Sequence, residues 1–197
     1  MKYQTSLLED WIQDFYYHLD IYHPHQLDFL EIAARLGLYI HFQKFSSRIY
    51  AGEIIIDERL SEQGQWEDFA HELCHLYRQD GNQLAMNKEF LLLQESKADN
   101  FALHFCIPTF MLLKNTINNF LDIDAGTPFV MEKFNVSEVF ARKRLQQFKS
   151  KILQAKADEE HRKFMNSIYP KAGPYSEETN STLDKLQQII DKKKGVS

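Results

Sequence analysis

Two histidines and a glutamate form the pattern with the clearest chemistry in this sequence, an H-E-x-x-H motif at His71, Glu72 and His75. The surrounding stretch, 65–79, reads as a helix, and in a helix of 3.6 residues per turn positions four apart share a face. Both imidazoles can therefore bind one metal ion. Glu72 lies about 60° around the helix from His75, close enough to hold a water molecule at the metal without being a ligand itself.

A second predicted helix, 87–105, carries two carboxylates and two alanines on one face. They are Glu95, Ala98, Asp99 and Ala102, which fall at i, i+3, i+4 and i+7. Small residues let another helix approach closely, and the carboxylates then require a positive partner. A solvated face would carry similar residues, but the leucines and phenylalanines of this helix indicate that much of it is buried. We therefore interpret Glu95 as a metal ligand.

The spacing between the two helices supports a three-residue metal site. Nineteen residues separate His75 from Glu95, which is enough for a turn of helix, a loop and an antiparallel return. Glu95 would complete a site of two histidines and one glutamate with one position open for water, as in catalytic zinc sites. Asp99 lies one turn further on and can accept the free N–H of His71 or His75, which would fix the orientation of that imidazole.

Three other histidines are weaker candidates for metal binding. His23 and His25 flank Pro24 in a polar turn, which favours a solvated loop over a metal-binding H-x-H pair. His104 lies nine positions beyond Glu95, about 900° of helical rotation, and therefore opposite the carboxylates. We interpret His104 as a structural or surface residue.

The two segments resemble the ImmA/IrrE family of zinc metallopeptidases. The resemblance is carried by HELCH at 71–75, ESKADNFA at 95–102 and the helix end FCIP at 105–108. It covers about residues 27–150 and implies that His71, His75 and Glu95 bind Zn²⁺. Glu72 would be the catalytic glutamate. Members are typically encoded by phages, integrative elements and stress-response systems and act on helix-turn-helix transcriptional repressors, so the resemblance implies a repressor as substrate.

The sequence departs from the family pattern at three places. Cys74 stands where the family usually has Gly, Lys97 where it often has Glu, and 105–108 replaces a Leu-Leu-Met-Pro ending. None of these changes removes a group that the chemistry needs. Cys74 can be a redox-sensitive neighbour of the metal, but the small thiol of a buried helix favours a packing role.

The remaining pattern predicts an α+β, mainly helical, zincin-like domain with a small β-sheet over the H-E-x-x-H helix, followed by C-terminal helices. Amphipathic helices are expected at 5–20 and 27–36, the second ended by Gly37. Runs of β-type residues at 38–42 and 50–57 suggest a sheet of about three strands. We expect 50–57 to be an edge strand that pairs with substrate backbone, the alternative being a strand paired only within the sheet.

The C-terminal part is expected to be helical. An apolar helix is predicted at 111–121, a loop at 122–128, and a helix from the N-cap Ser137 to about 157. The basic side chains of this last helix are expected on its surface: Arg142, Lys143, Arg144, Lys149 and Lys151. A polar stretch at 158–182 reads as a linker before a short amphipathic helix.

These patterns divide the chain into two parts. Residues 1–157 would form the metallopeptidase domain, with a helical C-terminal part at about 107–157, and residues 158–197 a linker and a C-terminal helix. Charge also differs along the chain: 1–130 contains 9 basic and 19 acidic residues, a net of −10, and 131–197 contains 14 and 9, a net of +5. The basic part would either dock a partner or pack against its own acidic body.

Composition excludes several classes of protein. The hydrophobic content of 44% is too high for a disordered chain, and no run of 18 apolar residues predicts a membrane span. The first residues lack the order of a signal peptide, and two cysteines give no disulfide framework. We therefore expect a cytoplasmic location.

The combined pattern predicts a zinc endopeptidase that cleaves a helix-turn-helix repressor. One alternative is a zinc-bound anti-repressor that removes the repressor from DNA without cutting it, which Glu72→Gln would distinguish. Another is a DNA-binding module at 128–157, which a salt-dependent shift of duplex DNA would reveal. The acidic chain shows no nucleic-acid-binding motif, so a protein partner is favoured, while the sequence does not define the oligomeric state.

Overall fold

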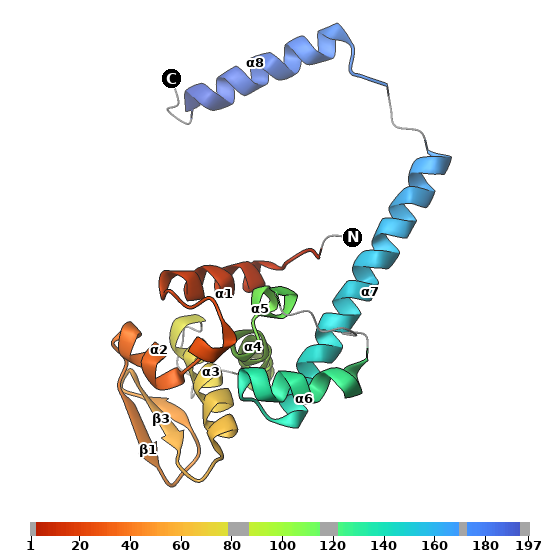
Figure 1. The fold of residues 1–197 in the computed structure, drawn as a ribbon. Coiled ribbons are helices and arrows are strands. Elements are labelled where there is room, and N and C mark those ends of the chain that lie inside the picture. The colour runs from red at the N-terminus through yellow and green to blue at the C-terminus, as the bar shows by residue number, and fades with distance from the viewer. Residues whose placement is uncertain (1–2, 79–86, 115–121, 170–172, 194–197) are drawn as a thin grey trace. The chain divides into compact units, whose positions relative to one another are not determined.

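The structure, a computed structural model, describes residues 3–78, 87–114, 122–169 and 173–193. The chain divides into two units, 1–155 and 156–197, and each is described by itself. The first unit has the predicted α+β architecture, in which a three-stranded sheet accompanies several helices (Figure 1). No helix in the described part of the chain is both long and apolar enough to cross a membrane.

Two helices, α3 (Glu62–Arg78) and α4 (Lys88–Cys106), pack along each other at the centre of the first unit (Figure 1). Asn87 caps the N-terminus of α4, because its side chain accepts a hydrogen bond from the backbone N–H of Phe90 at 2.8 Å. The buried rings of Trp66 on α3 and Phe105 on α4 pack against each other, with centroids 5.7 Å apart. Burial of each stabilises the fold by about 1.5–3 kcal/mol. Both predicted helices, 65–79 and 87–105, are present.

The sheet consists of β1 (Ile40–Gln43), β2 (Arg48–Tyr50) and β3 (Glu53–Asp57) in the order β1-β3-β2. β1 runs parallel to β3, and β2 runs antiparallel to it. Alternate residues Ile54 and Ile56 are fully buried, so one face of β3 packs toward α3.

The prediction that 50–57 forms one edge strand was wrong. Ala51 and Gly52 have φ values of 52° and 81°, so the chain reverses there in a two-residue hairpin turn. β3 follows the turn and is the central strand, paired on both sides. The two edge strands are β1 and β2, and Tyr50 belongs to β2. Period-two alternation reveals a strand, but its place in the sheet depends on pairing with distant residues.

Two N-terminal helices cover this centre. α1 (Leu7–His18) begins at the N-cap Ser6 and packs against α4, where the hydroxyl of Tyr16 donates to the backbone carbonyl of Phe105 at 2.9 Å. After a 3₁₀ turn, η1 (Pro24–Gln26), α2 (Phe29–Leu36) ends at Gly37 in the left-handed conformation, as its glycine predicted.

The loop predicted at 122–128 was wrong, because helix α6 (Ile123–Phe134) contains most of it. Asp122 caps this helix by accepting from the N–H of Ala125 at 3.2 Å. Pro128 lies inside the helix, where its missing N–H leaves the carbonyl of the exposed Asp124 free to bind water. Gly and Pro indicated a loop, but the capping aspartate and the buried Gly126 favour the helix.

Helix α7 (Glu138–Ile168) begins at the predicted N-cap Ser137 and is longer than expected. Glu67 of α3 accepts from the N–H of Ser137 at 2.6 Å and from its hydroxyl at 3.2 Å, so the helix that carries the H-E-x-x-H motif holds the start of α7. A short helix, α5 (Thr109–Lys114), lies between α4 and α6 in the sequence and occupies the first part of the predicted helix at 111–121. The remainder of that predicted helix lies outside the described residues.

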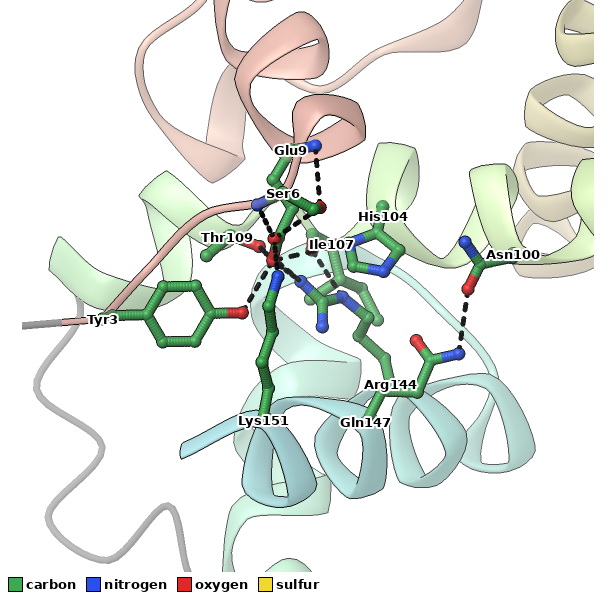
Figure 2. A network of polar contacts seen from close by, with 10 residues as sticks. All are labelled: Tyr3, Ser6, Glu9, Asn100, His104, Ile107, Thr109, Arg144, Gln147 and Lys151. Atoms are coloured by element: carbon green, nitrogen blue, oxygen red, sulfur yellow. Dashed lines mark hydrogen bonds and ion pairs between the residues drawn. The ribbon is translucent and has the colours of Figure 1, made fainter. Parts of the chain in front are cut away.

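A buried polar network joins α1, α5 and α7 around the carboxylate of Glu9 (Figure 2). Thr109 Oγ1 donates to this carboxylate at 2.5 Å, Tyr3 Oη donates at 2.7 Å, and Lys151 Nζ also contacts it. Burial by itself would raise the pKa of Glu9. The hydrogen bonds from these three residues outweigh burial and hold that pKa well below its usual range.

Arg144 belongs to this network, and its predicted place on the surface was wrong. Its side chain is fully buried, donates from Nη2 to Thr109 Oγ1 at 2.6 Å and lies 3.8 Å from Glu9. Nε donates to the carbonyl of Ile107 at 3.2 Å. Burial lowers the pKa of Arg144 to about 10, so the guanidinium remains charged at neutral pH. The partner, Glu9, lies far away in the sequence, so helical periodicity could not reveal the pair.

The second unit contains the last part of α7 and α8 (Glu177–Lys193). The predicted linker, 158–182, is therefore helical over much of its length. This unit exposes large apolar side chains: Phe164, Ile168, Tyr169, Tyr175, Leu183, Leu186 and Ile189. The buried hydrophobic core of the described residues lies within the first unit.

Candidate metal centre

The two histidines of the H-E-x-x-H motif lie one turn apart on α3 and point their Nε2 atoms at a common position. The two Nε2 atoms are 2.9 Å apart. Leu73 and Cys74 of the same helix are buried, and the contacts of both histidines with Glu95 show that the histidine face is turned toward α4. Two imidazole nitrogens this close at the edge of an apolar interface can share one cation.

Glu95 approaches the same position from α4. Its Oε2 lies 3.3 Å from Nε2 of His71, and its Oε1 lies 3.6 Å from Nε2 of His75. Donor atoms of all three residues lie within 4.8 Å of one another. The antiparallel packing of α3 on α4 therefore brings together the three side chains that the sequence singled out.

These distances fit a tetrahedral ion. Nitrogen and oxygen ligands about 2.0–2.2 Å from a tetrahedral zinc ion lie about 3.3–3.6 Å from each other. The observed separations of 3.3 and 3.6 Å lie at the two ends of that range, and the separation of 2.9 Å between the two Nε2 atoms is slightly shorter. Two imidazoles and one carboxylate are also the donor types that zinc takes when one position stays open for reaction.

Asp99 contacts the imidazole of His71 on the side away from the three converging donor atoms. Its Oδ1 lies 3.1 Å from Nδ1 of His71. This contact favours the tautomer that carries its proton on Nδ1, which leaves the lone pair of Nε2 facing the other two donors. Asp99 thus occupies the position expected of a residue that orients a ligand.

Glu72 lies beside the three donor residues and is largely buried. Burial, with a smaller contribution from the nearby carboxylates of Asp68 and Glu95, raises the pKa of its carboxyl to about 7, although the positive charges of His71 and Arg48 oppose the shift. A carboxyl with a pKa near neutrality can both accept and return a proton at physiological pH. A bound divalent cation would lower this pKa, because positive charge favours the carboxylate form.

The weaker candidates lie outside the group of three donors. His104 is buried in the Glu9 network, with Nδ1 3.8 Å from Glu9 Oε1. Burial and the charge of Arg144 lower the pKa of His104 to about 3, so this histidine is neutral. His23 and His25 stack on each other at an exposed turn, and neither belongs to a metal-binding group among the described residues. Cys74 is buried.

The structure also reveals a link that the sequence did not indicate. The hydroxyl of Ser47 donates to Asp68 Oδ2 at 2.5 Å and accepts from the N–H of Asp57 at 3.0 Å. Ser47 directly precedes β2, so this link fixes the edge strand to α3. Asp68 lies one turn before Glu72 on the same face of α3, a spacing that could have marked it. Nothing local to Ser47 predicts its role.

Comparison with known proteins agrees with this geometry. Residues 23–146 match the M78 peptidase family, described as the IrrE N-terminal-like domain. The matched segment contains all three donor residues, Glu72 and Asp99. The chain belongs to the ImmA/IrrE family.

Two relatives of this ImmA/IrrE protein come from Bacillus subtilis (strain 168). Phage-like element PBSX protein XkdA is 40% identical over 147 residues, which cover 73% of each chain. Uncharacterized protein YqaB is 38% identical over 160 residues, which cover 78% of this chain and 91% of the relative. No solved structure gives a significant match. Membership of this family supports a metallopeptidase type of chemistry, which implies a bound metal ion at the His71, His75 and Glu95 group.

Proposed function

We propose that this protein is a zinc-dependent endopeptidase that cleaves a helix-turn-helix transcriptional repressor of a phage or related mobile element. The single observation that carries the proposal is the meeting of His71, His75 and Glu95 donor atoms within 4.8 Å, with the carboxyl of Glu72 next to them. Membership of a peptidase family supports the reaction type.

His71, His75 and Glu95 would hold the ion, and Asp99 would keep the imidazole of His71 in position. A bound zinc ion supplies a Lewis acid that polarises a peptide carbonyl and makes water more acidic. Glu72 accepts the proton of the attacking water and returns it to the nitrogen of the leaving amine. Because Glu95 is 42% exposed and the two histidines are more buried, the site opens on the α4 side, where a peptide can enter.

A repressor is supported as substrate by two observations. One relative carries the name of a phage-like element, a setting in which regulation by repressors is common. In addition, residues 1–130 carry a net charge of −10, which complements the basic surface that a DNA-binding protein presents. An acidic protease body would attract such a substrate and would repel DNA itself.

The test uses the purified protein, the repressor encoded nearest to its gene, and mass spectrometry of the products. We expect the wild-type protein to produce two fragments, and a chelator or Glu72→Gln to abolish cleavage while the variant still binds zinc. An intact repressor that nonetheless leaves its DNA when the Glu72→Gln protein is added would contradict proteolysis and would indicate a non-proteolytic anti-repressor. Glu89→Gln serves as a control, because Glu89 is an exposed acid at the start of α4.

A further inference from the structure

An open pocket of about 340 Å³ lies at the N-terminal end of α3, on the side where α2 and β1 meet it. Its apolar wall is formed by Phe29, Leu30, Phe42 and Trp66. The volume lies at the lower end of the range for ligand pockets, which suits one or two side chains of a peptide better than a large cofactor. None of the residues at the metal centre lines this pocket.

The pocket exposes apolar surface that a ligand could cover. Leu30 is 49% exposed and Phe42 is 39% exposed, although both face a pocket whose deepest lining residue, Trp66, is only 3% exposed. Removing such surface from water is favourable by about 25 cal/mol per Å². An aromatic or branched aliphatic side chain is therefore the favoured occupant.

The negative charge at the rim of the pocket favours basic residues next to the bound side chain. Asp28 and Glu62 are its charged lining residues, and no lysine, arginine or histidine lines it. Asp28 uses Oδ1 to cap α2, accepting from the N–H groups of Leu30 and Glu31 at 2.8 and 3.1 Å. Glu62 makes no ion pair with a described residue. The rim therefore presents negative charge that a basic neighbour of the apolar side chain would neutralise.

We infer that this pocket is a second substrate-binding site of the protease, and that it holds an aromatic or aliphatic side chain flanked by Lys or Arg. The inference rests on the proposed function for the identity of the occupant, because a DNA-binding repressor is rich in basic residues. Trp66 precedes His71 by five residues, about 7.5 Å along the axis of α3 and about 140° around it, so the pocket and the metal centre lie on different faces of the helix. A folded protein substrate is large enough to contact both, and the pocket adds selectivity that residues at the cleaved bond need not supply.

The test measures binding without cleavage. The chain contains two tryptophans, so the indole N–H signal of Trp66 can be assigned in a ¹⁵N-labelled full-length Glu72→Gln protein by comparison with Trp11→Phe. The indole nitrogen of Trp66 is buried and has no hydrogen-bond partner among the described residues, so its signal reports changes in the pocket wall. The probes are the peptides acetyl-Lys-Phe-Lys-amide, acetyl-Lys-Ala-Lys-amide and acetyl-Glu-Phe-Glu-amide.

We expect a saturable shift of the Trp66 signal with the Lys-Phe-Lys peptide and at least fivefold weaker binding of the other two peptides. Glu62→Lys should weaken binding of the first peptide at least fivefold, whereas Glu89→Lys, which makes the same charge change on another helix, should leave it unchanged. Equal shifts with all three peptides, no saturable shift with the first, or an undiminished affinity in Glu62→Lys would overturn the inference.

The outcome is separable from that of the proposed function. If the wild-type protein fails to cut the repressor while the Trp66 signal responds as expected, the pocket binds basic apolar peptides and proteolysis is the failed claim. If the repressor is cut and the Trp66 signal does not respond, the proposed protease activity is supported and the second substrate-binding site is contradicted. In the same assay, Glu62→Lys should raise the KM for the intact repressor at least fivefold and leave kcat unchanged.

Discussion

Glu95 and Asp99 lie one turn apart on α4, yet they contact the metal centre differently. Glu95 lies 3.3 and 3.6 Å from the Nε2 atoms of the two histidines, whereas Asp99 contacts only Nδ1 of His71. We predict that Asp99→Asn lowers zinc affinity about 10–100-fold, the usual effect of losing a residue that orients a ligand. Glu95→Gln should lower zinc affinity by more, because it removes a ligand itself. Competition with a chelating dye measures both affinities.

The matched control for these variants is Glu89→Gln, an exposed carboxylate on the same helix. It should bind zinc as tightly as the wild type does. Wild-type affinity in Glu95→Gln, or a larger loss in Asp99→Asn than in Glu95→Gln, would show that the roles of the two residues are wrongly assigned.

Glu9 is the residue on which the buried network depends, because its carboxylate contacts both Lys151 and Arg144. We predict that Glu9→Gln lowers the free energy of unfolding by about 3 kcal/mol, since breaking a buried ion pair leaves the remaining charge uncompensated. Lys151, which is 35% exposed, can recover part of its hydration and keeps the cost at the lower end of the usual range. Urea unfolding measures the change.

Asp10→Asn provides the control for Glu9→Gln. Both acids lie in the first turn of α1, near the positive end of that helix, but Asp10 is exposed, and only Glu9 also accepts a hydrogen bond from the backbone N–H of Ser6, at 2.7 Å. We expect Asp10→Asn to change stability by less than about 1 kcal/mol. Equal losses in the two variants would mean that the helix end, and not the buried network, accounts for the effect of Glu9.

At the scale of elements, the attachment of β2 to α3 depends on the hydroxyl of Ser47. We predict that Ser47→Ala accelerates hydrogen exchange of the backbone amides of Arg48 and Tyr50, which face β3, about tenfold or more, because it removes a hydrogen bond to a carboxylate, worth about 1.5–3 kcal/mol. Zinc affinity should not change, and the KM for a protein substrate should rise. Mass-spectrometric or NMR exchange measurements follow the strand directly.

Ser46→Ala is the matched control for this strand, because the exposed Ser46 side chain makes no hydrogen bond with a described residue. The backbone amides of β2 should exchange at the same rate in Ser46→Ala as in the wild type. If Ser47→Ala also leaves exchange in β2 unchanged, the strand is held by its pairing with β3 alone and the link to Asp68 has no positioning role.

Elements with strong local signals could be predicted from the sequence. Gly37 ends α2 and Ser137 caps α7 as predicted, and α4 begins directly after Asn87, within one residue of its predicted start. The approach of Glu95 to the two histidines also followed from local patterns, because two amphipathic helices joined by a short connection pack antiparallel. That Glu95 and the two histidines bind a metal ion stays a prediction.

Features that depend on partners distant in the sequence could not be predicted. Burial of Arg144 requires Glu9 from another helix, and the central place of β3 requires the parallel pairing of β1. Ser47 acquires its role only because α3 places Asp68 beside it. Periodicity defines which face of an element is apolar, but not which element covers it.

For the molecule as a whole, His104 and Glu9 make stability depend on pH in the same direction. The pKa of His104 is about 3 in the folded chain and about 6.5 in an unfolded one, so between these values the unfolded state binds a proton that the native state does not. Stability is therefore lost as pH falls below about 6.5, by about 2 kcal/mol at pH 5. The lowered pKa of Glu9 adds a further loss below about pH 4.3.

The pH prediction is checked by urea unfolding at pH 7.5 and pH 5.0 in the wild type and in His104→Gln. The decline in the variant should be smaller by about 2 kcal/mol, because glutamine does not titrate. Comparing declines removes any constant effect of the substitution on packing. Parallel declines in the two proteins would show that His104 is not held neutral in the folded chain.

The most direct test of the metal centre is an X-ray structure of the zinc-loaded protein with anomalous data collected on both sides of the zinc absorption edge. A single anomalous peak should lie about 2.0–2.2 Å from Nε2 of His71, Nε2 of His75 and a carboxylate oxygen of Glu95. A zinc ion held by other residues, or one bound by the two histidines while the Glu95 side chain points away, would contradict the account.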